Sequence, residues 1–375
     1  MTRGADGLLH YGDLNPALTE LLDIRAHRYA DREAIVEIDG PRLTYRELWT
    51  SASKIAGALQ DRGIGVGDRV AIRLPNGARW VQAFLGALLS GAVPVPVNDS
   101  LGAAEVAHIL DDSAVDFVLD DEDLPQARPF IDDGASLGET ALLCYTNGTH
   151  GRPKGVELSN ENLLSAIESV VGALGLPDTG IRGLLALPLA HASGCVDQLL
   201  PILAVGGTVV LAPGADPDRL AHVLGSESVD VLATTVEQLR RLRTRPRSVA
   251  TVCCSGGGLD ADLAGRLRAS FPGARQRSLW GATETSGIGL LADACGCVGR
   301  PIGGTEIALW GPEASDGRGE LLLRGPNVTR GYWNNPTATA THFTGSWFHS
   351  GDFVEIGGDG LVRPARPASP QQTVA

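Results

Sequence analysis

Apolar and polar positions along the chain follow two series in which short strands alternate with amphipathic helices. The predicted helices of the first series span 18–27, 45–62, 78–90 and 103–112, and its strands span 34–38, 42–43, 69–74, 92–97 and 115–119. The second series has predicted helices at 160–174, 195–205, 217–225, 236–242 and 260–270, and strands at 184–186, 208–211, 229–233, 251–254 and 278–279. Such alternation is typical of parallel sheets covered by helices on both faces, so we expect two doubly wound sheets.

The pattern changes near residue 299, where helical spacing stops and short strands separated by glycine and proline follow. These strands, at 306–310, 320–324 and 354–356, predict a small β-barrel. The expected fold is therefore α/β, with two doubly wound sheets packed with helices in αβαβα layers plus a β-barrel. The predicted segments are an α/β unit at 1–139, a second at 140–298, the barrel at 299–362 and a disordered, Pro-rich tail at 363–375.

Composition narrows the classes of function. The formal net charge of −13 argues against non-specific nucleic-acid binding, which requires a basic face. The six cysteines form no C-x-x-C pair, which makes a zinc site or a disulfide framework unexpected. The chain shows no leader peptide and no apolar run long enough to span a membrane, so a cytoplasmic location is expected.

The richest local signal is the stretch LLCYTNGTHGRPKGV at residues 142–156. A strand-like apolar run breaks into hydroxyl, amide and glycine residues and then reaches Lys154. Small residues let backbone N–H groups turn toward an anion, and the lysine adds a positive charge, so the stretch predicts a phosphate-binding loop. It is not a Walker A loop, because Pro153-Lys154-Gly155 stands where G-K-[ST] is required.

Four further polar clusters lie in the second half of the chain, three of them at the ends of predicted strands and the fourth in the β-rich part. They are Leu187–Gly194 with His191 and Ser193, Ser255–Leu259 with Gly256, Gly257 and Gly258, Ser278–Thr285, and Phe348–Asp352. Ligands of open α/β sheets bind outside the carboxyl ends of the strands. We therefore expect the first three clusters to meet in one cleft.

The order and spacing of these segments resemble the adenylate-forming enzymes, which include acyl-CoA and aryl-CoA synthetases, peptide-synthetase adenylation domains and luciferase. Residues 145–155 match the family's Y-T-S-G-T-T-G-x-P-K-G loop, with Asn147 and His150 as departures. Residues 280–284 match [YW]-G-x-T-E, residues 350–352 match [TS]-G-D, and residues 319–332 match G-E-[LI]-x-x-[RK]-G-P-x-x-x-x-G-Y. Several motifs in a fixed order are far more specific than any one of them.

The resemblance implies ATP-dependent activation of a carboxylic acid to an acyl-adenylate, with ATP and Mg²⁺ bound and CoA or a carrier-protein thiol as acceptor. It implies that Glu284 holds Mg²⁺, that Trp280 lies against adenine and that Asp352 accepts the ribose hydroxyls. The implied catalytic residues are Thr146, Lys154, Thr283 and Glu284; the implied nucleotide-binding residues are Asn147, Gly148, Thr149, His150, Gly151, Gly256, Gly257, Gly258, Trp280, Gly281 and Asp352; the implied substrate contacts are His191, Ser193 and Ala282. His191 has an equal alternative as a satisfied buried histidine.

The family's mobile C-terminal domain, which carries the adenylation lysine, follows a hinge that Arg366 resembles, whereas this sequence ends at Ala375. The hypothesis is an adenylation core that lacks this domain and acts alone or with a partner in trans, such as a separate C-terminal domain, a carrier protein or an acyltransferase. The alternatives are a nucleotide-binding protein without turnover and a fragment of a full synthetase. An acyl or aryl acid is expected rather than an α-amino acid, because Ala190-His191-Ala192 lacks the aspartate that pairs with an ammonium.

Overall fold

The computed structural model describes residues 1–120, 123–146, 152–178, 180–212, 214, 216–293 and 296–366. Its largest element is a nine-stranded sheet with the strand order β16-β15-β14-β13-β12-β10-β11-β3-β4. The strands are β3 (Glu33–Glu37), β4 (Arg42–Thr44), β10 (Arg182–Leu185), β11 (Thr208–Leu211), β12 (Val231–Thr235), β13 (Thr251–Ser255), β14 (Arg275–Ala282), β15 (Gly287–Ala292) and β16 (Arg300–Pro301). The six strands from β14 to β3 are parallel, and antiparallel strands close both edges.

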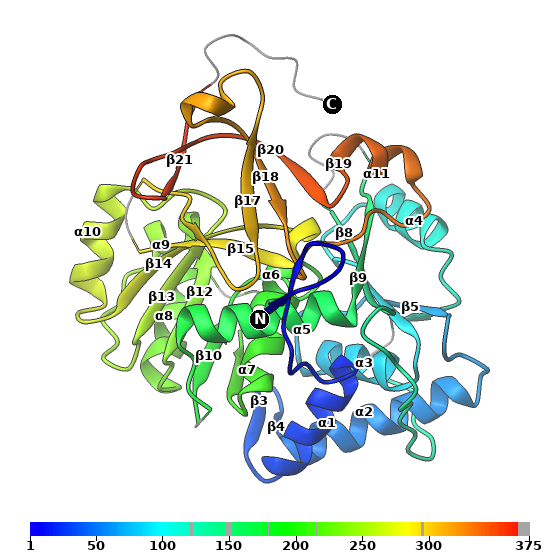
Figure 1. Cartoon of the computed structure of the whole chain (residues 1–375). Coiled ribbons are helices and arrows are strands. Elements are labelled where there is room, and N and C mark those ends of the chain that lie inside the picture. Colours follow the sequence, from blue (N-terminus) through cyan, green and yellow to red (C-terminus); the bar gives the residue numbers. More distant parts are fainter. Residues whose placement is uncertain are drawn as a thin grey trace.

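Both faces of this sheet are buried, because neighbouring residues of a strand point to opposite faces and both are apolar. In β3, Ile35 packs into one core and Val36 into the other, and Val209 and Val210 of β11 divide in the same way. The first core contains helices α1 (Leu18–Arg28), α2 (Tyr45–Gln60), α3 (Ala78–Leu89), α5 (Asn160–Leu174) and α7 (Leu200–Ala204). The second contains α8 (Pro217–Ser226), α9 (Val236–Arg241) and α10 (Ala261–Ser270), seen at the left of Figure 1.

A smaller parallel sheet lies on the other side of the helices of the first core. It has the order β6-β5-β7, formed by β5 (Arg69–Ile72), β6 (Val93–Pro96) and β7 (Phe117–Leu119), with α4 (Ala103–Asp112) beside it. The antiparallel hairpin of β8 (Thr140–Tyr145) and β9 (Gly155–Ser159) joins the layers. Leu142 and Cys144 of β8 face the helical core, while Leu143 and Tyr145 face the smaller sheet.

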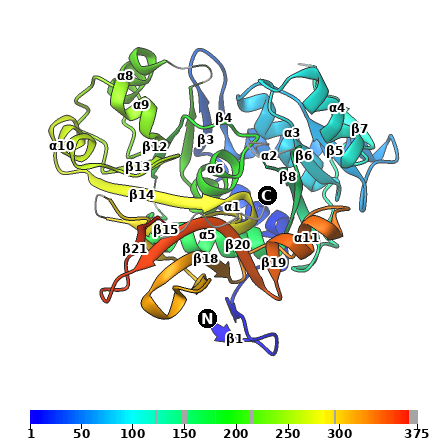
Figure 2. The same cartoon turned by 90° about the horizontal axis from the view of Figure 1, so that it is seen from above.

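Antiparallel strands cover one end of the molecule. The five-stranded sheet contains β17 (Glu306–Trp310), β18 (Arg318–Arg324), β19 (Phe343–Thr344), β20 (Trp347–Ile356) and β21 (Val362–Pro364). It lies above the nine-stranded sheet in Figure 1 and crosses in front of it in Figure 2, with α11 (Pro336–His342) at its end. The remaining elements are β1 (Thr2–Arg3), β2 (Leu9–His10), α6 (Ala192–Gly194), the π-helical turn η1 (Cys195–Leu199), and the 3₁₀ turns η2 (Thr283–Thr285) and η3 (Ala314–Asp316).

The predicted fold class is confirmed: α/β layers with two helix-packed sheets carry a separate β-rich part. The pairings of the β-rich strands leave the sheet open, as a half-barrel, instead of closing it. The predicted helix at 195–205 is interrupted by η1, and the predicted strand at 278–279 extends over Arg275–Ala282. Arg363 and Pro364, placed by the sequence in the tail, belong to β21, while 367–375 lie outside the described residues.

The division into four segments stays a prediction. The hairpin β3–β4 belongs to the predicted segment 1–139, but β3 pairs with β11, which belongs to the predicted segment 140–298. No helix in the described part of the chain has both the length and the apolar content that a membrane span requires.

Candidate active site

A cavity of about 620 Å³ lies where the parallel strands of the nine-stranded sheet end. Its wall includes Thr235 at the end of β12, Gly256 after β13, Ala282 at the end of β14 and His191 in the segment after β10. These positions are carboxyl ends of adjacent strands, which is where the fold class predicts a ligand. The expected meeting of the three strand-end clusters is therefore observed, and the cavity has the size of a small-molecule site.

The base of the glycine-rich loop is closed by two hydrogen bonds between its first and last residues. The Thr146 backbone N–H donates to the Lys154 carbonyl at 3.0 Å, and the Lys154 N–H donates to Thr146 Oγ1 at 3.1 Å. The hairpin β8–β9 thus holds the two ends of the loop together. The predicted phosphate contacts Asn147, Gly148, Thr149, His150 and Gly151 lie outside the described residues.

The Lys154 ammonium contacts two residues that were not predicted from the sequence. Its Nζ is 3.2 Å from Nε2 of His342 at the end of α11, and 5.2 Å from the centre of the Tyr332 ring. Burial, and then the charge of Lys154, lower the pKa of His342, so the neutral ring accepts from the ammonium. This arrangement fixes a cation beside the loop.

Glu284 is 8% exposed and lies in the turn η2 that follows β14. Its Oε1 accepts a hydrogen bond of 2.6 Å from the Tyr332 hydroxyl, whose pKa is raised by burial and by the adjacent carboxylate. Among the described residues, none is bonded to the second oxygen, Oε2. Thr283, the preceding residue, lines the cavity. Glu284 therefore links the cavity, through Tyr332, to Lys154.

The turn that carries Glu284 is held by the segment after β18. The Asn327 side chain donates to the Thr285 carbonyl at 3.0 Å, and the Ser286 hydroxyl donates to the Asn327 carbonyl at 2.7 Å. All three residues are buried. Because buried hydrogen bonds from Asn327 and Ser286 hold it, the turn is a preorganised element and not a mobile surface loop.

Trp280 and Asp352 form a pair between the two large sheets. The indole Nε1 of Trp280, on β14, donates to Asp352 Oδ2 on β20 at 2.8 Å. Asp352 is exposed, and its backbone N–H donates to the Ser350 hydroxyl at 3.1 Å. An aromatic ring beside an exposed carboxylate presents a stacking surface together with an acceptor for hydroxyl groups.

Glycine residues occupy the ends of β13 and β14 for different structural reasons. Gly256 has φ of +69° and borders the cavity, whereas Gly257 and Gly258 are exposed and lie outside its lining. A side chain at Gly281 would lie 2.1 Å from the Gly287 carbonyl oxygen, so the close approach of β14 and β15 requires glycine there. Gly281 and Ala282 both line the cavity.

His191 lines the cavity and is also satisfied by a hydrogen bond. Asn98 Nδ2 lies 2.8 Å from His191 Nε2, and burial lowers the pKa of the ring, so Nε2 is the acceptor of a neutral imidazole. The two readings of His191 are therefore compatible. Ser193 lines the same cavity, and its carbonyl accepts from the Gln198 side chain at 3.0 Å.

Asp197, in the π-helical turn η1, also lines the cavity. Its Oδ1 accepts a hydrogen bond of 2.8 Å from the Ile288 backbone N–H. Burial raises the pKa of this carboxyl to about 7, and the Ile288 bond offsets part of the effect. The neighbouring Gly287 has φ of +90°, and a side chain there would lie 2.0 Å from Asp197 Oδ1.

Replacing Asp197 by asparagine is expected to stabilise the protein more at pH 8 than at pH 5. The folded-state pKa of about 7 exceeds the ordinary value of 3.8, so the folded protein binds more protons than the unfolded chain between these values. The free energy of unfolding therefore falls as pH rises through this window. Asparagine keeps an acceptor for Ile288 and carries no charge, which should add on the order of 1–2 kcal/mol more at pH 8 than at pH 5. Urea unfolding at both values measures this, and equal gains would contradict it.

The structure gathers the predicted residues into two groups. His191, Ser193, Gly256, Gly281, Ala282 and Thr283 line the cavity. Thr146, Lys154, Glu284, Trp280 and Asp352 lie outside its lining and are held by the contacts described above. Tyr332, Asn327, His342 and Asp197 were not among the site residues predicted from the sequence. Tyr332 and Asn327 belong to the matched segment at 319–332, which could have indicated them, whereas no local signal indicates His342 or Asp197.

Comparison with known proteins agrees with this geometry. The sequence profile of the AMP-binding enzyme family matches residues 22–136 and 127–333. Feruloyl-CoA synthase from Amycolatopsis is 31% identical over 380 residues, covering 90% of this chain and 76% of that protein. The 2-succinylbenzoate–CoA ligase of Bacillus licheniformis is 30% identical over 374 residues, covering 90% of this chain and 77% of that protein.

Solved structures show the same fold. The inhibitor-bound N-terminal domain of FACL13 from Mycobacterium tuberculosis matches with a TM-score of 0.87 at 25% identity, covering 94% of this chain and all of that one. O-succinylbenzoate-CoA synthetase from Bacillus subtilis, in complex with ATP and magnesium, matches with a TM-score of 0.84 at 26% identity, covering 93% of this chain and 79% of that one. The chain belongs to the AMP-binding enzyme family and is an AMP-forming ligase similar to the acyl-CoA synthetases.

Proposed function

We propose that the protein activates a carboxylic acid, acyl or aryl, with ATP, forming an acyl-adenylate and releasing pyrophosphate. The observation that carries this proposal is a series of contacts from an acid-sized cavity to Lys154, at the base of the glycine-rich loop. Thr283 lines the cavity, Glu284 follows it, and Tyr332 connects Glu284 to Lys154. Such a series of contacts would align the acid with the phosphates of a bound nucleotide.

The nucleotide would lie with its adenine against Trp280 and its ribose hydroxyls on Asp352. Thr146, Lys154 and the loop residues Asn147, Gly148, Thr149, His150 and Gly151 would hold the phosphates. Gly256, Gly257, Gly258 and Gly281 would border the adenine and the acid. The hydrogen bond between Trp280 and Asp352, and the closed base of the loop, support these assignments.

The residues around Glu284 fit a magnesium ion shared with phosphates. Magnesium in nucleotide enzymes takes one or two carboxylates and completes its shell with phosphate oxygens and water. Glu284 offers this donor, because Tyr332 occupies only Oε1. The described residues contain no cluster of three or more metal-ligating side chains, so a cation here would take its other ligands from the nucleotide and water. When bound, it would neutralise negative charge on the phosphate oxygens.

In the proposed step a carboxylate oxygen of the acid attacks the α-phosphorus, and the bond from that phosphorus to the β-bridging oxygen breaks. Pyrophosphate leaves with the electron pair of the broken bond. The protein forms no covalent bond and contributes by alignment and charge stabilisation. Thr283 would donate to an α-phosphate oxygen, and Lys154 would stabilise the charge that builds on the leaving group.

The acid would occupy the cavity beside His191, Ser193 and Ala282. The names of the curated relatives support CoA as the acceptor of the activated acyl group, because feruloyl-CoA synthase and 2-succinylbenzoate–CoA ligase are both CoA ligases. A carrier-protein thiol, or a C-terminal domain acting in trans, are the other partners that the sequence analysis suggests.

Pyrophosphate release, measured with ATP, Mg²⁺ and a panel of acyl and aryl acids, tests the proposal. We expect release that depends on the acid and formation of the matching acyl-adenylate, detected by mass spectrometry. The same reactions with CoA added test for the thioester. ATP binding without pyrophosphate release for any acid, also after addition of a complete synthetase's C-terminal domain, would contradict the proposal.

A further inference from the structure

Asp197 is a charged group in an otherwise apolar and neutral part of the cavity. Among the described residues that line the cavity, it is the only carboxylate, and no lysine or arginine lines it. Leu184, Ile202 and Val231 are typical of the remaining wall. A carboxylate is costly to keep in such surroundings unless a partner satisfies it.

The protein provides a hydrogen-bond donor to only one oxygen of the Asp197 carboxylate among the described residues. Oδ1 accepts from the Ile288 N–H, and no described residue donates to Oδ2 or forms an ion pair with Asp197. Burial without a compensating cation raises the pKa of the Asp197 carboxyl to about 7. The carboxylate is therefore half satisfied by the fold, and its second oxygen is available to a molecule in the cavity.

Local backbone structure places Asp197 in this position. The π-helical turn η1 interrupts the run from α6 to α7, and such turns in helices often occur at functional sites. The absence of a side chain at Gly287 lets the carboxylate approach the β15 backbone. Asp197 is only partly buried and lines the cavity, and its Oδ2 has no partner among the described residues, so this oxygen can accept a hydrogen bond from a molecule in the cavity.

We propose that Asp197 is a specificity-determining residue that binds a hydrogen-bond donor, a hydroxyl or a protonated amine, on the acid substrate away from its reacting carboxylate. The inference rests on the proposed function, because it assigns the cavity to the acid. It predicts that the substrate is a polar, donor-bearing acid and not a plain fatty acid or unsubstituted aryl acid.

Like-charge repulsion gives Asp197 a second effect on the same substrate. The reacting carboxylate of the acid is negative, so it is disfavoured beside Asp197 and favoured at the Thr283 side of the cavity, where the nucleotide phosphates and Lys154 are expected. Attraction of the donor and repulsion of the carboxylate therefore favour the same orientation. Asp197 would act as a positioning group at the end of the substrate that does not react.

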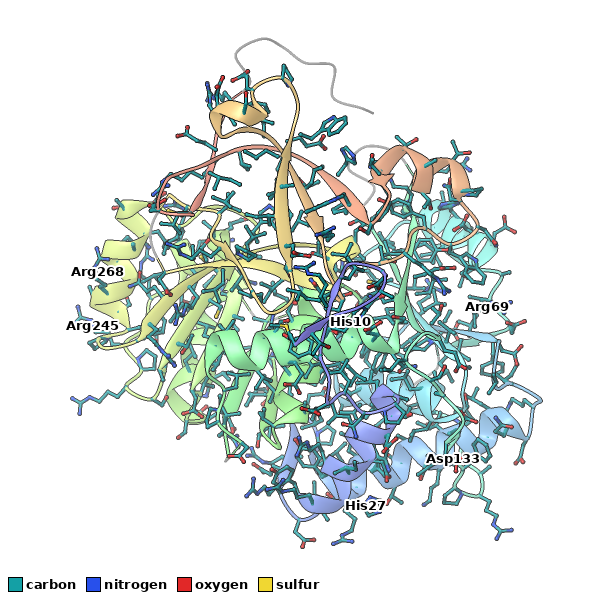
Figure 3. The ribbon with its side chains drawn as sticks, in the orientation of Figure 1. His10, His27, Arg69, Asp133, Arg245 and Arg268 are labelled. Atoms are coloured by element: carbon teal, nitrogen blue, oxygen red, sulfur yellow. The ribbon has the colours of Figure 1, made fainter. Side chains whose placement is uncertain are left out.

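Calorimetric binding of matched acid pairs tests the inference without requiring turnover. Each pair differs by one donor: para-hydroxybenzoate and benzoate, para-hydroxycinnamate and cinnamate, and para-(aminomethyl)benzoate and para-ethylbenzoate, together with the meta isomers. The proteins are the wild type, Asp197→Asn, Asp197→Ala and the control Asp133→Asn. Asp133 is exposed and lies at the periphery in Figure 3, so this control repeats the acid-to-amide change away from the cavity.

For at least one pair, wild type and the Asp133→Asn control should bind the donor-bearing acid about tenfold more tightly. Asp197→Asn and Asp197→Ala should reduce that preference to about threefold or less while binding the plain acid as well as, or better than, wild type does. A purely structural role would instead weaken both members of a pair equally. Preference for the plain acid in every pair, or a preference that survives both substitutions, would overturn the inference. Pyrophosphate release in the same samples reports separately on the proposed function.

Discussion

Replacing Glu284 by glutamine is expected to lower pyrophosphate release by about 10²–10³-fold, with a smaller effect on ATP binding. Glu284 is buried in a turn that Asn327 holds in place, so the amide should occupy the same position. The amide removes the negative charge and presents a weaker ligand to magnesium. The measurement is the rate of pyrophosphate release over a range of Mg²⁺ concentrations, together with the dissociation constant of ATP.

Tyr332→Phe is the matched control for the Glu284 substitution. It removes the hydrogen bond to Glu284 Oε1 but keeps the ring beside Lys154. Because the carboxylate remains, we expect a loss of about tenfold and a shift of the Mg²⁺ dependence to higher concentration. Release that is unchanged in Glu284→Gln would exclude a role for this carboxylate in the reaction. Absence of release in the wild type, with ATP binding intact, would support the alternative of a binding protein.

Local patterns predicted most elements of the fold, because the longer helices have a clear apolar period, and α2, α5, α8, α9 and α10 also have a side-chain N-cap. The predicted helix at 160–174 is α5, and Ser159 accepts from the Asn162 N–H at its start, as its position suggested. Strand β9 was missed because it is short and runs directly into that cap. The π-helical turn η1 was missed because its residues fit an ordinary helical pattern.

Pairings between distant segments could not be predicted in the same way. Strand β3 belongs to the first series in the sequence but pairs with β11 of the second, and no local pattern encodes this choice. The same limit applies to the site. The carboxyl-end rule predicted which clusters meet in the cavity, whereas Glu284 and Tyr332 are separated by 48 residues and Lys154 and His342 by 188. Only the three-dimensional structure identifies these partners.

Asp197 was not predicted as a residue of the site, and its position in the fold explains why. In the sequence it is one polar position in a predicted amphipathic helix, where a solvent-exposed charge is the ordinary expectation. The π-helical turn rotates it toward the cavity and the β15 backbone instead. A residue that departs from its local pattern in this way is a candidate for function, because the fold must compensate for its burial.

Replacing Asp352 by alanine is expected to raise the KM for ATP by about 10–100-fold and to change kcat less. The proposed role is to accept hydrogen bonds from the ribose hydroxyls, and charge-assisted bonds of this kind contribute about 1.5–3 kcal/mol. Asp352 is exposed on β20, and its one described side-chain partner is the Trp280 indole, so alanine should leave the fold intact. Steady-state kinetics with ATP varied at a saturating concentration of acid measure both constants.

Trp280→Phe separates the ribose contact from the orientation of the carboxylate. Phenylalanine keeps an aromatic surface for adenine but removes the N–H that donates to Asp352 Oδ2. If that bond only orients an exposed carboxylate, the KM for ATP should rise by about threefold or less, since hydrogen bonds at exposed positions contribute little. Replacement of ATP by its 2′-deoxy analogue should cost the wild type about tenfold in KM and cost Asp352→Ala almost nothing, because the acceptor is already absent. Equal losses in both proteins would show that Asp352 does not contact the 2′-hydroxyl.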